Sequence, residues 1–460
     1  MKITISNEIR IDGAPQEMVK RIKRQLTMDN PEYSKKKRMG FWVGNTPQVL
    51  SLYWEDAGSI YIPCGAGTIV QPFITPQTEI IEDLAERSDL VYEGQVDLYG
   101  YQEAAVTACV RAGRGILQSP CGSGKTQMGI GLAAALRGRT LWVTHTNDLL
   151  EQSYERAAKY FPTSCMGKIA AGKVSIGSHF TFATVQTLSR LDLTQYKYFW
   201  DTVIVDECHR VAGSPAACTM FYRVMSALAA RYKFGLTATA HRSDGLIKTT
   251  YAVIGPVIYQ VPDSAVKEKT MQVAVQRVDT HVETSEQILD TDGTISYGKL
   301  IPYLAGNTQR NDLIGKILQE NKGHSCLVLS DRLEHLQTLL QYVDPEDAAL
   351  IDGKMQSKRA KAQRLKAIED MRSGKKHYLF ASYGLAKEGL DIPRLDRLFL
   401  TLPRRDYSVV TQSVGRIARV FEDKEQPVCY DFVDQIGFCE RSYKKRKTSY
   451  RKAGCLIWEQ

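Results

Sequence analysis

The sequence predicts an α/β protein in which a small basic α+β domain precedes two tandem, doubly wound domains with parallel sheets. Three observations predict this fold. A chain of 460 residues is too long for a single hydrophobic core. A glycine-rich turn at Gln118–Thr126 joins a strand-like run to a helix-like run. Around and beyond this turn, two series of apolar strand-like runs alternate with helical segments, which is typical of parallel sheets covered by helices.

Composition indicates an ordinary globular protein, with 43% hydrophobic and 24% charged residues. The sequence shows neither a run of about 18 apolar residues nor a signal-peptide pattern. We therefore expect no membrane partner and a cytoplasmic location, in the host cell if a phage encodes the chain. The ten cysteines form neither a disulfide framework nor a zinc-binding pattern. The net charge of +9, with its excess near both ends, favours a polyanionic partner.

Residues 1–90 are expected to form the accessory domain. Met18–Leu26 has the pattern of a basic amphipathic helix, and short alternating segments of a small β-rich unit follow later. Between them a basic run adjoins aromatic residues. Because basic side chains neutralise phosphates and exposed rings stack on bases, we predict nucleic-acid binding; the alternative is that the rings form the core of the small sheet. The basic run contains Lys35, Lys36 and Lys37.

The glycine-rich turn lies in the first α/β domain, expected over residues 91–255, and predicts a nucleotide-binding loop. Glycines let backbone N–H groups turn toward an anion, and the positive end of the following helix faces the same phosphates. Lys125 would reach the β and γ phosphates of ATP, and the Thr126 hydroxyl would hold Mg²⁺. The alternative is a glycine- and serine-rich turn that merely contains a lysine. The residues assigned to the nucleotide are Ser119, Cys121, Gly122, Ser123, Gly124, Lys125 and Thr126.

A helix is predicted to precede the loop, beginning near Leu98 and ending at Gly113. Gln102 lies in this helix. Its side chain has one acceptor and two donors, which can match the edge of adenine. Gln102 is assigned to the nucleotide only together with the other motifs described below.

Two carboxylates follow a predicted core strand at Thr202–Val205. Asp206 is placed to hold Mg²⁺ through water, and Glu207 to orient or deprotonate the attacking water. A helix cap is the alternative, but the position of the pair downstream of a phosphate loop argues against it. Thr237 and Thr239 follow a further strand and can link the carboxylates to neighbouring groups through hydrogen bonds.

Polar side chains also follow the neighbouring predicted strands, where the ligands of open α/β sheets bind. Their hydroxyl and amide groups suit a sugar–phosphate chain. We therefore predict that nucleic acid lies along these strand ends. The residues assigned to this contact are Thr144, Gln152, Thr184, Gln186 and Thr187, with Ser382 at the end of a strand in the second domain.

The second α/β series is expected to form a domain at residues 311–440, after a linker or insertion at 256–310 and before a basic tail at 441–460. This domain has no phosphate loop of its own, so we expect it to complete the site of the first. The planar, permanently charged guanidinium of arginine suits a γ-phosphate. The completing residues are Gly389 and Asp391 in a loop, and Gln412, Arg416 and Arg419 on one helix face.

Together these motifs resemble those of the superfamily 2 helicases. Within that superfamily, the Asp206–His209 box and the Leu236–Arg242 segment are most similar to XPB-type repair helicases and phage branch-migration helicases. The resemblance implies two RecA-like domains with ATP and Mg²⁺ between them, a nucleic-acid strand across them, and 3′ to 5′ movement. Two residues depart from the family pattern: Ser119 stands where alanine or glycine is usual, and Tyr99 where an arginine is common.

The expected function is that of an ATP-dependent DNA helicase or translocase. Basic segments at both ends of the motor suit branched DNA, so we expect action on forks and Holliday junctions, including branch migration, in recombination, repair or replication. A monomer is expected. The alternatives are an RNA helicase and a duplex DNA translocase that separates no strands. A nucleotide-gated binding module without turnover is disfavoured by the complete set of catalytic residues.

Overall fold

The structure is a computed structural model that describes residues 1–120, 122–239, 242, 244–266, 270–351, 358–387, 390, 392–404 and 407–458. The chain divides into two compact units near Pro262. The first unit carries a small N-terminal sheet and the first parallel sheet, and the second unit carries the other parallel sheet. No helix among the described residues combines the length and the apolar character needed to cross a membrane.

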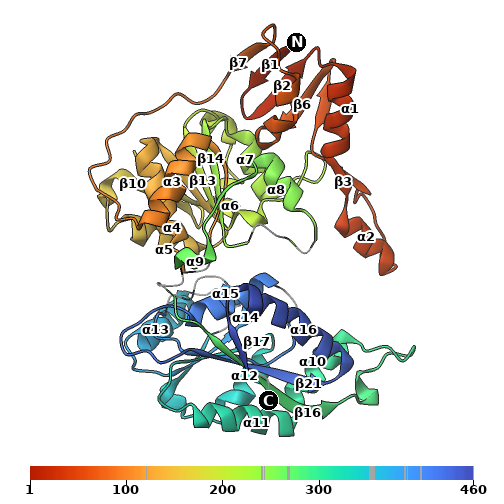
Figure 1. Cartoon of the computed structure of the whole chain (residues 1–460), viewed down its shortest axis with the longest axis vertical. Helices are drawn as coiled ribbons and strands as arrows, with labels where there is room; N and C mark the ends of the chain where they lie inside the picture. Colours follow the sequence, from red (N-terminus) through yellow and green to blue (C-terminus); the bar gives the residue numbers. More distant parts are fainter. Residues whose placement is uncertain are drawn as a thin grey trace. The chain divides into compact units, whose positions relative to one another are not determined.

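The N-terminal sheet has the strand order β5-β6-β2-β1-β7, and helix α1 packs against it (Figure 1). The helix predicted near Met18–Leu26 is α1, whose Met18 and Ile22 are buried against the sheet. Trp54 and Tyr61 stack on each other with ring centroids 3.7 Å apart. The elements are β1 (Lys2–Ile5), β2 (Glu8–Asp12), α1 (Gln16–Gln25), β5 (Trp54–Asp56), β6 (Ser59–Pro63) and β7 (Glu79–Glu82).

This small sheet shares a core with the first parallel sheet. Ala252 of helix α8 belongs to the same hydrophobic cluster as the isoleucines of the N-terminal sheet. At Gly65 a Cβ atom would lie only 2.5 Å from the backbone oxygen of Tyr251, so only glycine permits this contact. The connection from β7 to helix α3 is also tied down: Ser88 N–H donates to Asp201, and the Tyr92 hydroxyl donates to the backbone of Gly138. The accessory region is therefore part of the first unit.

A short hairpin of β3 (Thr27–Asp29) and β4 (Val49–Ser51) carries helix α2 (Pro31–Arg38) between its strands. We call residues 30–48 the arm. Asn30 closes the base of the arm, since its N–H donates to Gln48 O and its Nδ2 donates to Pro47 O. Helix α2 has no buried residue, so the arm stands out from the N-terminal sheet (Figure 1).

The first parallel sheet has the order β11-β10-β12-β9-β13-β14-β8-β15, and all its pairs are parallel except β10 with β11. Its central strands are fully buried apolar runs, as expected where helices cover both faces. Helix α3 ends at Gly113, as predicted, with φ +69°. The strands are β8 (Arg114–Gln118), β9 (Thr140–Thr144), β10 (Met166–Ala170), β11 (Lys173–Val174), β12 (Phe180–Thr184), β13 (Thr202–Asp206), β14 (Tyr232–Thr237) and β15 (Val257–Gln260). The helices are α3 (Gly100–Ala112), α4 (Lys125–Leu136), α5 (Asn147–Ala157), α6 (Val185–Leu188), α7 (Met220–Ala227), α8 (Ile247–Val253) and α9 (Asp263–Val266).

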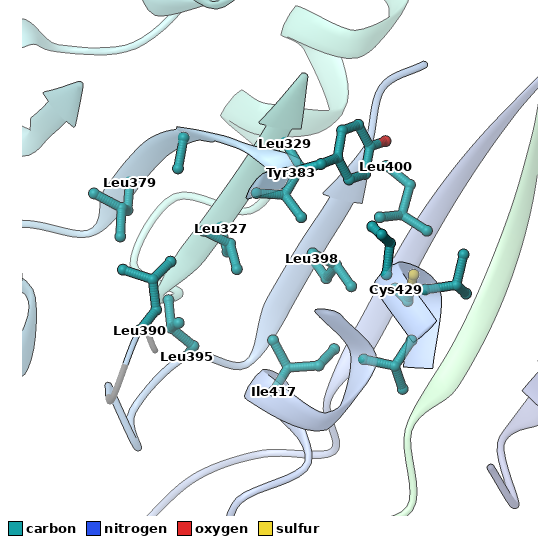
Figure 2. Packing of buried hydrophobic residues seen from close by; sticks show 14 of the residues in the cluster. Leu327, Leu329, Leu379, Tyr383, Leu390, Leu395, Leu398, Leu400, Ile417 and Cys429 are labelled. Carbon is teal, nitrogen blue, oxygen red and sulfur yellow. The ribbon is translucent and has the colours of Figure 1, made fainter. Parts of the chain in front are cut away.

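The second parallel sheet has the order β18-β19-β17-β20-β21-β16-β22, with every pair parallel. Figure 2 shows Leu327, Leu329, Leu398 and Leu400 from the central strands packed with Ile417 of helix α15. The strands are β16 (Ala274–Glu283), β17 (Cys326–Ser330), β18 (Ala348–Ile351), β19 (Tyr378–Ser382), β20 (Arg397–Leu400), β21 (Val428–Gln435) and β22 (Leu456–Trp458). The helices are α10 (Tyr297–Gly306), α11 (Thr308–Glu320), α12 (Leu333–Leu340), α13 (Lys358–Arg372), α14 (Tyr383–Lys387), α15 (Tyr407–Ile417) and α16 (Gly437–Lys452). The predicted pair of parallel-sheet domains is thus confirmed.

Two stretches are more regular than the sequence indicated. Residues 256–310, expected to connect the domains, contribute β15 to one sheet and β16 to the other. Residues 441–460, expected to form a basic tail, supply most of α16 and then β22. Arg446 is not part of a basic surface: it is 2% exposed, and its guanidinium makes two hydrogen bonds to Asp431, at 2.7 and 2.8 Å.

Candidate functional site

The glycine-rich loop joins β8 to α4, as predicted. Gly122 and Gly124 have φ angles of +84° and +80°, which L-residues with a Cβ rarely adopt. Lys125 begins α4, a helix of 12 residues, so the backbone N–H groups of its first turn and its positive end face the loop. Ser119, which stands where the family pattern has a smaller residue, is fully buried, and its backbone N–H donates to Thr237 O at 2.9 Å. This is the local geometry of an anion site.

Gln102 lies beside this loop. Its Oε1 accepts a hydrogen bond from the N–H of Tyr99, which fixes the side chain at the start of α3. A Cβ atom at position 124 would lie 2.5 Å from Gln102 Nε2. Gly124 therefore serves two purposes, the left-handed turn and the close approach of Gln102. Cys121 lies outside the described residues.

The two carboxylates sit at the carboxyl end of β13, and Lys125 reaches them. Glu207 adopts φ +50°, and its backbone N–H donates to Asp206 Oδ1 at 2.9 Å. The distance from Lys125 Nζ to Glu207 Oε1 is 3.9 Å. Phosphate-binding and water-orienting groups predicted from separate motifs are thus close together.

Asp206 and Thr126 fit a magnesium ion by their chemistry. Burial, with the charge of Glu207, holds the pKa of Asp206 well above its usual range. A cation at this point would favour the charged carboxylate. Carboxylate and hydroxyl oxygens are hard ligands of the kind that Mg²⁺ prefers. Among the described residues there is no group of three or more histidine, cysteine or acidic side chains that would indicate a different metal site.

His209, which was not among the predicted site residues, joins the carboxylates to the Thr237–Thr239 segment. Its Nδ1 lies 3.3 Å from Glu207 Oε2 and 3.1 Å from Thr237 Oγ1. The Thr237 hydroxyl donates to Thr239 O, so its proton is already used and Nδ1 of His209 must carry the hydrogen. Arg242 Nη1 donates to the backbone oxygen of His209 at 2.6 Å. The predicted link between the carboxylates and the threonines thus runs through an imidazole.

The predicted nucleic-acid residues of the first sheet converge at its carboxyl edge. Thr144 and Thr184 are register partners on β9 and β12. Both are buried, and the Thr184 hydroxyl donates to Thr187 Oγ1 at 3.1 Å. Gln186 Nε2 donates to the backbone oxygen of His145 at 2.7 Å. The two buried hydroxyls thus fix the ends of their strands, and the half-buried Gln186, Thr187 and Gln152 are nearer to solvent.

In the second unit, Gln412 and Arg416 lie on α15, but Arg419 does not. The helix ends at Ile417, and Arg419 forms an isolated β-bridge with Thr270, so the prediction of both arginines on one helix face is wrong. Arg416 Nη1 donates to Leu390 O at 3.1 Å. Ser382 ends β19, as predicted. Gly389 and Asp391 lie outside the described residues.

Lys424 explains where α15 ends and was not anticipated. Its Nζ donates to three backbone oxygens: Ile417 O at 2.8 Å, Arg419 O at 2.7 Å and Pro393 O at 3.1 Å. A cation at this point satisfies carbonyls that a helix terminus leaves without partners. Burial lowers the pKa of Lys424 to about 8. One side chain therefore ties the segment that carries Arg416 and Arg419 to the loop before β20.

Lys35, Lys36 and Lys37 all lie on α2, in the arm, but they differ in surroundings. Lys36 Nζ bonds Thr46 Oγ1 and pairs with Glu32, both at 2.8 Å. Lys35 and Lys37 are exposed. Two of the three predicted contacts are therefore open to a ligand, and the third holds the arm together.

Two protein-family models match the chain. The family described as "Type III restriction enzyme, res subunit" matches residues 76–242, and "Helicase conserved C-terminal domain" matches residues 309–421. The first range contains the phosphate loop and the carboxylates. The second contains Gln412, Arg416 and Arg419.

Curated relatives and solved structures agree with these matches. ATP-dependent RNA helicase L396 of Acanthamoeba polyphaga mimivirus is similar at 27% identity over 74% of the chain and 63% of its own length. Helicase D10 of Escherichia phage T5 is 26% identical over 74% of the chain and 72% of its length. DNA 3'-5' translocase XPB2 of Sulfurisphaera tokodaii is 29% identical over 41% of each chain. An HsdR fragment of a type I restriction enzyme from Vibrio vulnificus has a similar fold, with a TM-score of 0.56 at 18% identity over 78% of the chain and 67% of its own.

Proposed function

We propose that the chain is an ATP-driven DNA motor that remodels branched DNA such as forks and Holliday junctions. The premise is that it belongs to the superfamily 2 helicases. The observation that carries the proposal is the approach of Lys125 to Glu207 beside Asp206, at the edge of the sheet that also gathers the hydroxyl and amide groups. A phosphate-binding cation and a water-orienting carboxylate in one place are what ATP hydrolysis requires. The strand ends nearby supply groups suited to a sugar–phosphate chain.

Each residue has a proposed part in hydrolysis. The backbone N–H groups at Gly122–Gly124 and the start of α4 hold the phosphates, and Lys125 offsets their charge. Thr126 and Asp206 would hold Mg²⁺, which on binding neutralises charge that develops between the phosphates. Glu207 orients the attacking water, and His209 fixes the Glu207 carboxylate. Arg416 and Arg419 stabilise the transferred phosphoryl group.

The choice of DNA over RNA rests on the relatives and is simple to test. XPB2 is named for DNA, whereas the mimivirus protein is named for RNA. Contacts to phosphates do not distinguish the two polymers, because only the 2′-hydroxyl does. ATPase rates measured with single-stranded DNA, with RNA and without polymer decide the question. Stimulation by DNA alone supports the proposal, and stimulation by RNA alone replaces it with the RNA-helicase alternative.

Branched-DNA preference should depend on the exposed lysines of the arm. Lys35→Glu with Lys37→Glu should weaken fork binding and reduce the salt slope of log K by about 2, because about two phosphate contacts are lost. Lys322→Glu with Lys375→Glu, two exposed lysines at the amino edge of the second sheet, is the matched control. Deletion of residues 1–90 is a poorer test, since it would uncover the core shared with Ala252. The salt slope of fork affinity, measured from 50 to 200 mM salt, should differ from that of the unmodified chain only in the Lys35 and Lys37 variant. If this variant and the unmodified chain have equal slopes, the arm does not contact the DNA.

Lys424→Met should lower kcat by about 10- to 100-fold, because small displacements of positioned groups have effects of that size. The substitution keeps the length of the side chain but leaves three backbone oxygens without their donor. Because the described hydrogen bonds of Lys424 all end on backbone oxygens of its own unit, KM for ATP should change little. Lys424→Arg, which keeps the charge, should retain much of the rate. A variant with normal kcat, or one in which only KM changes, would show that Lys424 does not position Arg416 and Arg419.

A further inference from the structure

The tip of the arm presents a tryptophan that the fold orients but does not bury. Trp42 is 87% exposed, and the adjacent Phe41 is 61% exposed. At Gly44, where φ is +49°, a Cβ atom would lie 2.6 Å from the Trp42 ring. The six-membered ring of the indole therefore lies close to the backbone of Gly44, which only glycine allows at this distance. Most of the ring surface is nevertheless exposed.

The end of α2 directs this segment outward. The Phe41 N–H donates to Lys36 O and the Gly40 N–H to Lys37 O, and Gly40 has φ +66°. This is the hydrogen-bond pattern of a Schellman motif, in which the residue after the glycine usually packs on the one at the position of Lys36. Lys36 instead bonds Thr46 and Glu32 through its ammonium, and Phe41 remains 61% exposed. The motif ends the helix and leaves the two rings exposed together.

The charge around the rings identifies the partner. Lys35, Lys37 and Arg38 are exposed on the same short helix, and Glu32 is its one acidic residue. A strongly basic surface beside a flat exposed ring is the combination that binds a phosphate backbone and stacks on a base. An apolar protein partner would not be favoured by this charge, and an acidic one would not require the exposed indole ring.

We propose that Trp42 stacks on the base exposed at the branch point of forked DNA, while Lys35, Lys37 and Arg38 hold the adjoining phosphates. The inference rests on the proposed DNA motor function and deepens it, because it assigns the residue that reads the end of a duplex. The ring is 87% exposed and lies in the arm directly after the basic helix α2, so it can stack on a terminal base pair or on the first unpaired base while the basic side chains hold the backbone.

Intrinsic fluorescence and fork affinity test the proposal on the full chain. Forked DNA should quench the fluorescence of the unmodified protein, and Trp42→Phe should remove most of that quenching. Trp458→Phe, at another exposed tryptophan, should retain it. Trp42→Ala should bind forked DNA at least about fivefold more weakly, which is the lower end for loss of one base–aromatic stack. Trp42→Phe should retain most of the affinity, since the smaller ring still stacks.

The Gly44→Ala variant tests whether the orientation of the Trp42 ring matters, because it changes the orientation but keeps the ring. The added methyl group meets the indole and strains the backbone at φ +49°, so fork affinity should fall although Trp42 remains. ATPase stimulated by single-stranded DNA should be unchanged in every variant, because a single strand has no branch point for Trp42 to contact. Equal fork affinity and quenching for Trp42→Ala, Gly44→Ala and the unmodified chain would overturn the inference. A failure of any polymer to stimulate the unmodified chain would instead refute the motor function itself.

Discussion

Glu207→Gln should bind ATP but hydrolyse it about 10²- to 10⁴-fold more slowly, the range expected for loss of a general base. The amide has the shape of the carboxylate but cannot take a proton or hold the water by charge. The Lys125 ammonium, 3.9 Å away, remains to bind phosphate, so affinity for ATP should be retained. Single-turnover hydrolysis and binding of a fluorescent ATP analogue measure the two quantities separately.

Lys125→Ala is the companion variant. It should also lose turnover, but for a different reason, because it removes the positive charge on the transferred phosphate and therefore weakens binding. The contrast between the two variants tests the assignment more strongly than either alone. Near-normal turnover by Glu207→Gln would discard Glu207 as the water-orienting group.

Arg416→Ala should lower kcat on the order of 10³-fold, the scale of an arginine finger, and Arg419→Ala should do so as well. KM for ATP should change much less, since the loop and Lys125 hold the nucleotide. Arg416 Nη1 also donates to Leu390 O, so part of the loss in Arg416→Ala is expected to come from the missing bond to Leu390. Steady-state ATPase with saturating single-stranded DNA provides kcat and KM for both variants.

Arg416→Lys distinguishes charge from geometry. Lysine keeps the charge but cannot reproduce the planar fork of donors, so its rate should lie much closer to alanine than to arginine. If either alanine variant retains most of the kcat of the unmodified protein, the arginine at that position is not an arginine finger. The proposal that the second unit contributes to hydrolysis at that position then fails.

Much of the fold was predictable because its signals are local. The run Val203–Val205 is apolar on both faces of its strand, which only a sheet covered on both sides explains, and it is the buried strand β13. The phosphate loop combines glycine conformations with a following helix, and both features depend on neighbouring residues alone. Gln102 could be placed near the loop only because a family pattern relates the two.

Other features depend on distant contacts and could not be predicted. Strand β16 seemed to be linker because Arg277 and Asp279 interrupt its apolar pattern, but these two side chains pair with each other, and Arg277 pairs with Glu440. Arg446 lies in the segment expected to be a basic tail, but it is buried by its pairing with Asp431, which is 15 residues earlier in the chain. His209 and Lys424 each join near neighbours to one distant residue, Thr237 for His209 and Pro393 for Lys424. Among the aromatic residues of the N-terminal region, Tyr53 packs against the core of the small sheet, whereas Trp42 is exposed, a difference that their sequence neighbours do not show.

The continuous packing of the first unit determines how a mechanical load passes through it. Residues 83–97 include no helix or strand, but their hydrogen bonds to Ala229, Asp201 and Gly138 fasten them to the parallel-sheet domain. Gly65 is also in close contact with the backbone of α8. The N-terminal sheet and the parallel sheet that carries the phosphate loop therefore pack as one body. If the arm holds DNA as proposed, tension on that DNA would pass through this packing, and Gly65→Ala, which loosens it, should then lower the stall force.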